Sequence, residues 1–219
     1  MTFSILARDA ETGALGGAAA TGSLCVGGWV LRGDGRAGLS ASQGAAPSTF
    51  WGEEALARMR AGESAAAAVA AITGADPGRA HRQLAALDVA GGTGAFTGAG
   101  NTDAKGAREA PGRVVTGNLL AGEGVLDAIA EGFAGAPGAL SDRLLAALRA
   151  GEAAGSDSRG LMSAALLVVA PDAPPLTLRI DWAEAPLDAL ARLLARTRAP
   201  DYAEWLATVP TLDAPHRPG

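Results

Sequence analysis

The chain begins, over residues 2–21, with TFSILARDAETGALGGAAAT. Apolar and polar residues alternate after Thr2 as far as Arg8, which is typical of a β-strand. The segment ETG at 11–13 supplies turn residues, and small residues continue over 14–21 as a second strand. So many small residues in a strand indicate tight packing or a close backbone approach. We therefore expect a β-hairpin, with Thr2 as the first residue of its first strand.

Beyond this hairpin, groups of strands alternate with groups of helices. Strands are expected at 26–32, 37–43, 84–89, 94–97, 113–120, 163–170 and 176–181, the first four strands of the chain forming an antiparallel meander. Helices are expected from Ser48 or Thr49 onward and at 63–73, 79–83, 122–133, 140–150 and 186–196. Regular βαβ alternation is absent, so the order predicts an α+β fold, a four-layer α-β-β-α sandwich of two mainly antiparallel sheets. We expect one domain over 1–198 and a C-terminal tail over 199–219.

Composition narrows the classes of protein to which this chain can belong. Of its 219 residues, 48% are hydrophobic and only 4% aromatic, so Ala, Leu and Val must build the core. The formal net charge is −5 with no block of like charge, which argues against a nucleic-acid partner. No apolar run reaches the roughly 18 residues that a membrane span needs. We expect a cytoplasmic protein with no membrane partner.

Several well-known catalytic and binding motifs are missing. There is no phosphate-binding G-x-x-x-x-G-K-[ST], no clean G-x-G-x-x-G, no H-E-x-x-H and no G-x-S-x-G nucleophile elbow. With one cysteine (Cys25) and two histidines (His81 and His216), a His-rich metal site is not expected, although a carboxylate site stays open. Cys25 fits a small buried apolar residue. We expect neither a cofactor nor a metal.

The first two residues carry the most specific chemical hint. Methionine aminopeptidases remove Met1 when a small residue follows it, and Thr2 is small. An N-terminal Thr has a nucleophilic hydroxyl, and its own α-amine, with a pKa of about 7.7–8.0, can act as the general base. The strand that ends with Gln43 and Gly44 leads toward a helix, whose backbone N–H groups can form an oxyanion hole. The alternative is that Thr2 is only the first residue of a sheet.

Six segments resemble the bacterial and archaeal family called domain of unknown function 1028. They are MTFSILARDAETGALGGAAA at the start, ASQG (41–44), DPGRAHRQLAALD (76–88), GNLLAG (117–122), RLLAALRAGEAAGSDSRGLMSAALLVVA (143–170) and LRIDWAEAPLDALARLL (178–194). That family is placed by its fold in the Ntn-hydrolase-like superfamily, so the resemblance implies the α-β-β-α sandwich. It implies no particular reaction, because the family is uncharacterised in function.

The chain departs from the wider superfamily at the partners of the nucleophile. Proteasome-like members pair it with a carboxylate and a Lys, whereas the second strand here ends in three alanines and Thr21 where an Asp would stand. Family members often read Ser-Lys where this chain has Thr21-Gly22. The single Lys, Lys105, lies in the polar segment NTDAKG. A Lys-assisted mechanism is therefore not expected.

Other polar residues sit at or within apolar strands. Asn118 lies inside one, so it serves either a site or a structural hydrogen bond across the sheets. Asp157, Arg159 and Ser163 precede or begin a buried strand and are candidates for binding the substrate. The alternative for Asp157 and Arg159 is a surface ion pair that contributes little.

Taken together, these features predict hydrolysis of a small amide or related bond. Thr2, Gln43, Gly44 and Asn118 are the expected catalytic residues, with a small-molecule substrate and a homo-oligomeric assembly. The alternative is a non-catalytic relative on the same fold that binds a small metabolite or serves as a structural oligomer.

Overall fold

The hairpin expected at the start of the chain is present in the computed structural model, which describes residues 2–156 and 159–217. β1 (Thr2–Arg8) and β2 (Leu15–Thr21) pair antiparallel along their whole lengths. Asp9 closes the turn between them, because its carboxylate accepts hydrogen bonds from the backbone N–H groups of Glu11 and Thr12. The pattern of residues 2–21 therefore predicted this local structure correctly.

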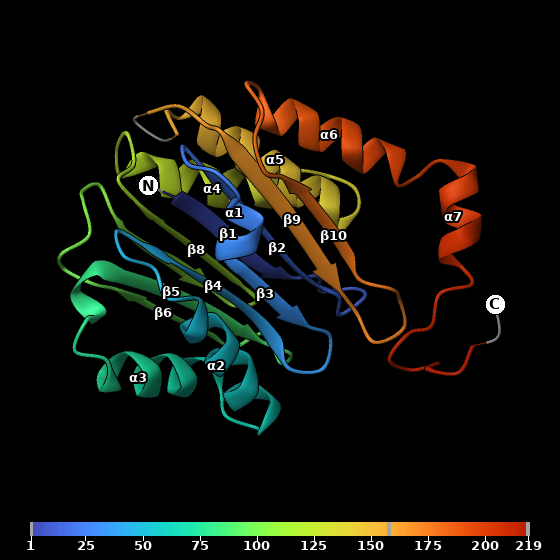
Figure 1. Ribbon diagram of the computed structural model, residues 1–219, viewed down its shortest axis with the longest axis horizontal. Helices are drawn as coiled ribbons and strands as arrows, with labels where there is room; N and C mark the ends of the chain where they lie inside the picture. Colours follow the sequence, from blue (N-terminus) through green and yellow to red (C-terminus); the bar gives the residue numbers. More distant parts are fainter. Residues whose placement is uncertain (1, 157–158, 218–219) are drawn as a thin grey trace.

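Two antiparallel sheets and the helices packed against them make up a mixed α+β fold (Figure 1). The larger sheet has the order β10-β9-β2-β1-β8-β7, with β7 (Gly106–Ala110), β8 (Arg113–Asn118), β9 (Ser163–Val169) and β10 (Leu176–Ile180). The smaller sheet has the order β3-β4-β5-β6, with β3 (Leu31–Asp34), β4 (Gly38–Gly44), β5 (Arg82–Asp88) and β6 (Thr93–Thr97).

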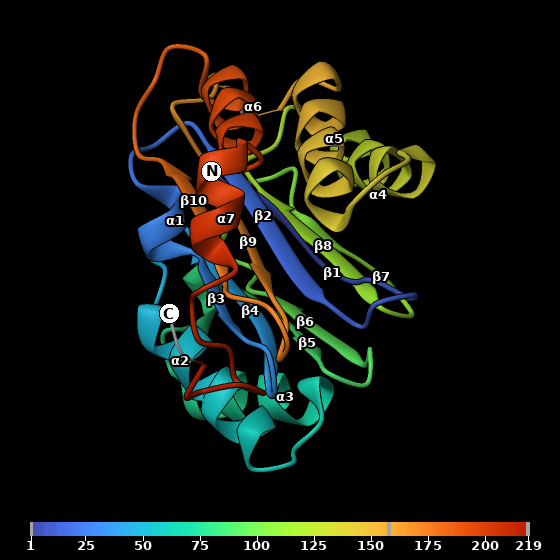
Figure 2. The ribbon, with the colours of Figure 1, turned by 90° about the vertical axis from the view of Figure 1, so that its right-hand side faces the viewer.

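The helices divide between the two sheets. Figure 2 shows α4 (Gly124–Gly135), α5 (Leu140–Ala153) and α6 (Pro186–Arg196) on the side of the larger sheet. The same view shows α2 (Thr49–Arg60) and α3 (Ala65–Ala75) beside the smaller sheet. None of the helices in the described part of the chain is both long and apolar enough to cross a membrane.

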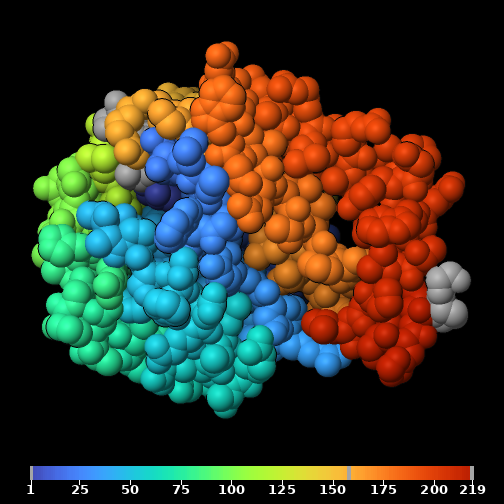
Figure 3. Space-filling view, viewed as in Figure 1, coloured from blue at the N-terminus to red at the C-terminus, as the bar shows by residue number. Residues whose placement is uncertain are grey.

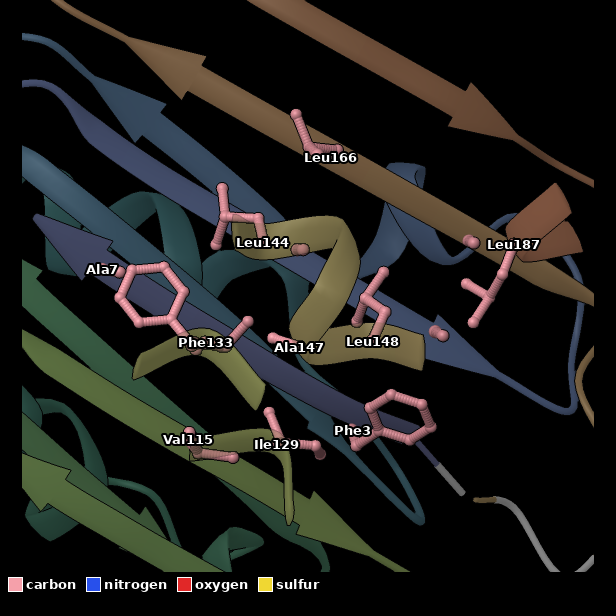
Figure 4. Close-up of a cluster of buried hydrophobic side chains, with 14 of the residues drawn as sticks. Phe3, Ala7, Val115, Ile129, Phe133, Leu144, Ala147, Leu148, Leu166 and Leu187 are labelled. Atoms are coloured by element: carbon pink, nitrogen blue, oxygen red, sulfur yellow. The ribbon is translucent and has the colours of Figure 1, made fainter. Parts of the chain in front are cut away.

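Strand alternation on β1 sends side chains into two separate apolar clusters. Phe3 and Ile5 pack with residues of α4 and α5 in the cluster drawn in Figure 4, whereas Leu6 packs between the sheets against Leu39 and Leu87. A third cluster joins the smaller sheet to α2 and α3. Because successive side chains of a strand point to opposite faces, β1 contributes to the core on both of its faces.

The small residues of β2 allow α5 to approach the larger sheet closely. A Cβ at Gly16 would lie 2.6 Å from Leu144 Cδ1 and 2.8 Å from Leu140 Cδ2. Such distances are far below van der Waals contact, so any larger residue at position 16 would push the helix away. The close approach that the composition of this strand indicated is confirmed.

The structure corrects several other expectations. The strand expected at 26–32 is instead the short helix α1 (Val26–Trp29) followed by β3, and β2 and β3 lie in different sheets, so there is no four-stranded meander. A short apolar run does not distinguish a strand from a helical turn by its periodicity. The predicted helix at 79–83 is only a 3-10 turn over Arg79–His81. Strand β7 and helix α7 (Pro200–Leu206), which lies in the segment expected to be a tail, were not predicted.

Candidate functional site

A cavity of about 520 Å³ opens at the edge of the fold where β1 begins. Figure 3 shows the dark-blue start of the chain deep in a hollow of the surface. The lining residues come from the start of β1, the end of β2 with the segment that leads to β3, the end of β4 with the loop that follows it, and the segment before β9. They are Thr2, Thr21, Ser23, Leu24, Val26, Trp29, Val30, Gln43, Gly44, Ala45, Pro47 and Arg159.

The register of the larger sheet places Thr2 in a row of polar side chains. Thr2 is the cross-strand partner of Thr21 on one side and of Asn118 on the other, and Thr21 is in turn the partner of Ser163. Directly paired residues project from the same face of a sheet, so the four side chains share the face toward the smaller sheet. The Thr2 hydroxyl donates a hydrogen bond to Thr21 Oγ1 over 3.1 Å.

Gln43 connects the smaller sheet to Thr2. Its Nε2 donates to the backbone carbonyl of Thr2 at 3.2 Å and to Gln83 Oε1 at 2.7 Å, while its Oε1 accepts from Ser4 Oγ at 2.9 Å. The Gln43 side chain is only 1% exposed. The amide therefore fixes the backbone at the start of β1 from across the gap between the sheets.

Gln83 is the centre of this buried network and was not among the site residues expected from the sequence. Its Nε2 donates to Thr97 Oγ1 and to the backbone carbonyls of Gly106 and Gly117 at 2.8–3.1 Å. Carbonyl oxygens only accept, so the orientation of the Gln83 amide is fixed, and its Oε1 must face the site. The sequence did hold a signal: Gln83 alternates with Ala85 and Leu87, which both pack between the sheets.

Asn118 takes its orientation from Gln83. Its Nδ2 donates to Gln83 Oε1 at 3.1 Å. Since the donor end of the amide is turned toward Gln83, the acceptor Oδ1 is presented away from it, in the strand position directly beside Thr2. Asn118 therefore makes the structural hydrogen bond across the sheets that was one of its two expected roles, and it also borders Thr2.

Gly44 supplies a backbone N–H on the cavity side of β4. Ser42 N donates to Val30 O, so amides at 42 and, by strand alternation, 44 point toward β3 and α1 rather than toward β5. Gly44 has a φ of +133°, and a Cβ there would lie 2.6 Å from His81 O, so only glycine fits. The Ala45 N–H is occupied by Asn101 Oδ1 at 2.9 Å.

Helix α2 does not supply the expected donors directly after Gly44. The helix begins only at Thr49, and Ala46 N donates to His81 O. The intervening loop is held by Arg82, whose Nε donates to Ala46 O at 3.1 Å and which pairs with Asp76. Burial opposes ionisation of Asp76, but hydrogen bonds from Gly78 and Arg82 outweigh it, and its pKa lies below the usual value. Asp76 therefore stays ionised and keeps Arg82 against the loop.

Of the three residues expected to bind the substrate, Asp157, Arg159 and Ser163, the two that the structure describes do not share one environment. Ser163 is fully buried, donates to Ser23 O at 2.7 Å and accepts from Val26 N at 3.1 Å, so it supports the segment that lines the cavity. Arg159 is exposed and lines the cavity. Asp157 lies outside the described residues. Contact of these residues with a substrate stays a prediction.

Among the described residues, the hydrogen bonds and ion pairs of Lys105 and Cys25 are made with residues other than Thr2. Lys105 Nζ donates to Ala99 O at 2.7 Å and pairs with Asp103 at 3.0 Å, so it belongs to the loop before β7. Cys25 is half-buried, has a φ of +60° and precedes α1. Within residues 2–156 and 159–217, no group of three His, Cys, Asp or Glu side chains is arranged to hold a metal ion.

Comparison with known proteins gives a consistent assignment. A solved structure, protein SPO2555 from Silicibacter pomeroyi, is 54% identical, with a TM-score of 0.95 over 99% of this chain and 98% of that one. That crystal structure is described by the same family model as this chain, and no curated protein matches the chain significantly. The model named "Family of unknown function (DUF1028)" matches residues 2–190. The chain belongs to the DUF1028 family.

Proposed function

We propose that this protein is an N-terminal nucleophile hydrolase that cleaves a small amide or related bond. The observation that carries the proposal is the position of Thr2, whose side chain lines the cavity while its carbonyl is held by Gln43. The three apolar clusters, one between the sheets and one under each set of helices, support reading the fold as a four-layer α-β-β-α sandwich of the Ntn-hydrolase-like superfamily.

In the proposed reaction, removal of Met1 frees the α-amine of Thr2. The amine takes the proton of Thr2 Oγ1 as this oxygen attacks the substrate carbonyl carbon. The negative charge that develops on the carbonyl oxygen is stabilised by the N–H of Gly44. The protonated amine then gives its proton to the departing nitrogen, leaving an ester on Thr2. Water, deprotonated by the same amine, hydrolyses that ester and restores the Thr2 hydroxyl.

The residues around Thr2 suit this chemistry. Asn118 is the cross-strand neighbour of Thr2 and is oriented by Gln83, and in the proposed reaction its Oδ1 accepts an N–H of the α-amine and so directs its lone pair. Thr21 Oγ1 accepts from the Thr2 hydroxyl in the resting state. None of the described lining residues has an acidic side chain, so the α-amine of Thr2 is the group that we propose as the base.

Intact mass and a variant series test this proposal. The natively expressed protein should lack the mass of one Met. In a screen of small amides, Thr2→Ala and a non-cleavable residue placed before Thr2 should both abolish turnover, while Thr2→Ser retains part of it. Thr12→Ala, an exposed Thr in the turn after the same strand, is the matched control and should leave turnover unchanged.

Two results would reject the catalytic role of Thr2. One is full retention of Met1, which favours a binding protein on the same fold. The other is turnover that survives the N-terminal extension, because the extension removes the free amine. In either case the alternative is a relative on the same fold that binds a small metabolite or serves as a structural oligomer, and light scattering would show whether the protein assembles as the expected homo-oligomer.

A further inference from the structure

The cavity has two chemically different halves. Its floor, next to Thr2, is polar and uncharged, with the side chains of Thr21 and Gln43. Five further lining residues are apolar and are called the apolar wall here: Leu24, Val26, Trp29, Val30 and Pro47. A site with a polar end for the reacting group and an apolar wall beside it is the usual form of a site for a small organic ligand.

Two side chains of the apolar wall are exposed, although the segment that carries them is firmly held. Leu24 and Trp29 are each 53% exposed. Yet Cys25 N donates to Asp181 O, and a Cβ at Gly27 would lie 2.7 Å from Arg179 Cγ, so α1 is packed closely against the last strands. The two side chains are therefore presented to the cavity by a fixed backbone, and their exposure leaves apolar surface for a ligand to cover.

Charge further limits what this wall accepts. Arg159 is the one charged side chain among the described lining residues, and it is a cation. A positively charged ligand group would lose hydration against Leu24 and Trp29 without gaining a counter-ion from these residues. The wall therefore favours an uncharged apolar group over a cationic one of the same length.

We infer, on the basis of the proposed function, that the substrate is an amide whose acyl part is apolar and carries no positive charge, and that this part packs on Leu24 and Trp29. A cavity of about 520 Å³ is larger than an amide group alone requires and lies within the usual range of about 300–1,000 Å³ for ligand sites. In this arrangement Trp29 determines acyl-chain specificity, while Thr2 performs the chemistry.

The test is a series of acyl anilides that share one leaving group. Acetyl, butyryl, hexanoyl and 6-aminohexanoyl p-nitroanilides differ only in the group that would meet the wall. We expect kcat/KM to rise about threefold to fourfold for each added methylene, as burial of one CH₂ predicts. The 6-aminohexanoyl compound should fall well below the hexanoyl one.

Variants of two exposed tryptophans assign the effect to the wall. Trp29→Ala should lower kcat/KM for the hexanoyl compound by about tenfold or more and flatten the rise with chain length, and Trp29→Phe should restore most of it. Trp182→Ala is the matched control, since Trp182 is 64% exposed but does not line the cavity. An unchanged slope in Trp29→Ala would overturn the inference.

A binding measurement separates this inference from the proposed reaction. Calorimetry with the Thr2→Ala variant and acetamide, hexanamide and 6-aminohexanamide needs no turnover. Suppose that hexanamide binds more tightly than acetamide and 6-aminohexanamide, but the native protein hydrolyses none of them. This result would reject the reaction and support the apolar site. No preference for hexanamide would overturn the inference even if hydrolysis occurs. It would also be overturned if Trp29→Ala dissociates an oligomer and leaves the acyl preference unchanged, because Trp29 would then cover a second copy.

Discussion

The interface between the two sheets is apolar at one end and polar at the other, although both ends exclude water to the same degree. Leu6, Leu39 and Leu87 lie in the apolar end and are at most 1% exposed. The polar end consists of Ser4, Gln43, Gln83, Thr116 and Asn118, which are at most 3% exposed. The two ends lie on the same strands, only a few residues apart.

The difference shows how the molecule combines stability with a defined site. Apolar burial is non-directional, so the leucine end stabilises the fold without fixing one orientation. Hydrogen bonds are directional, and the polar end has no unpartnered buried side-chain nitrogen or oxygen among the described residues. The network is also uncharged, which avoids the large cost of burying ions. The polar end therefore holds Thr2 in place at a modest cost in stability.

The largest effect on stability is expected at the apolar end. Leu39→Ala should lower the free energy of unfolding by about 2–5 kcal/mol, because Leu39 is fully buried and packs opposite Leu87. Urea denaturation followed by circular dichroism measures it. Hydrolysis below the unfolding transition should be retained. A loss below about 1 kcal/mol would show that the leucine end is not the main source of stability in this interface.

A smaller loss of stability, with a larger loss of function, is expected at the polar end. Gln83→Met keeps the side-chain length but leaves Asn118 Nδ2 without its acceptor, at about 1–3 kcal/mol for a buried group left unsatisfied. Hydrolysis should fall because Asn118 loses its orientation. The measurement is again urea denaturation, together with turnover.

Leu84→Met is the matched control for Gln83→Met. Leu84 is the next residue of β5, is equally buried and faces the helices instead of the other sheet. This nearly volume-conserving exchange should cost less than about 1.5 kcal/mol and leave turnover intact. If both variants behave alike, the polar end acts only through packing and the comparison between the two ends fails.

The smallest effect on stability is expected at Asp9, the residue that follows the last residue of β1. Hydrogen bonding from the backbone of Thr12, partly opposed by burial and supported by Arg143, lowers the pKa of Asp9 below its usual 3.8. A carboxyl with a lowered folded-state pKa stabilises the fold above the unfolded-state pKa, and this contribution is lost as the pH falls through the folded-state value.

The pH dependence of unfolding tests Asp9. The native protein should lose more stability than Asp9→Asn between pH 5 and pH 3, by less than about 1 kcal/mol because these bonds are near the surface. Turnover at neutral pH should not change, since the turn lies at the opposite end of β1 from Thr2. A steeper loss in Asp9→Asn would show that other carboxylates control acid unfolding.

Elements with strong periodicity could be predicted from the sequence, and elements defined by distant contacts could not. The amphipathic helix at 186–196 has the predicted bounds, because its leucines recur with the helical period. Strand β7 reads GAREA, an edge strand without apolar alternation, so it was missed. Helix α1 was missed because its two glycines are required by contacts with β9 and β10.

In the candidate site, too, some features could be predicted from the sequence and others could not. Asn118 and Gln43 could be selected from the sequence because a polar side chain within an apolar strand must have a partner. Their connection through Gln83 could not, since the partner lies in the other sheet and no local pattern encodes how two sheets stack. The family and the α+β fold are confirmed, whereas the hydrolase activity stays a prediction.

The environment of Lys105 has a consequence for chemical labelling. The chain has a single lysine, and its amine is tied to the loop before β7 by the Ala99 carbonyl and by Asp103, with the side chain only 20% exposed. The other primary amine of the polypeptide is its α-amino group. A reagent that acylates primary amines can therefore react with two groups, the shielded amine of Lys105 and the α-amino group of the N-terminus. A single added acyl group that maps to the first peptide of the chain would report on the accessibility of the chain start, without any knowledge of the substrate.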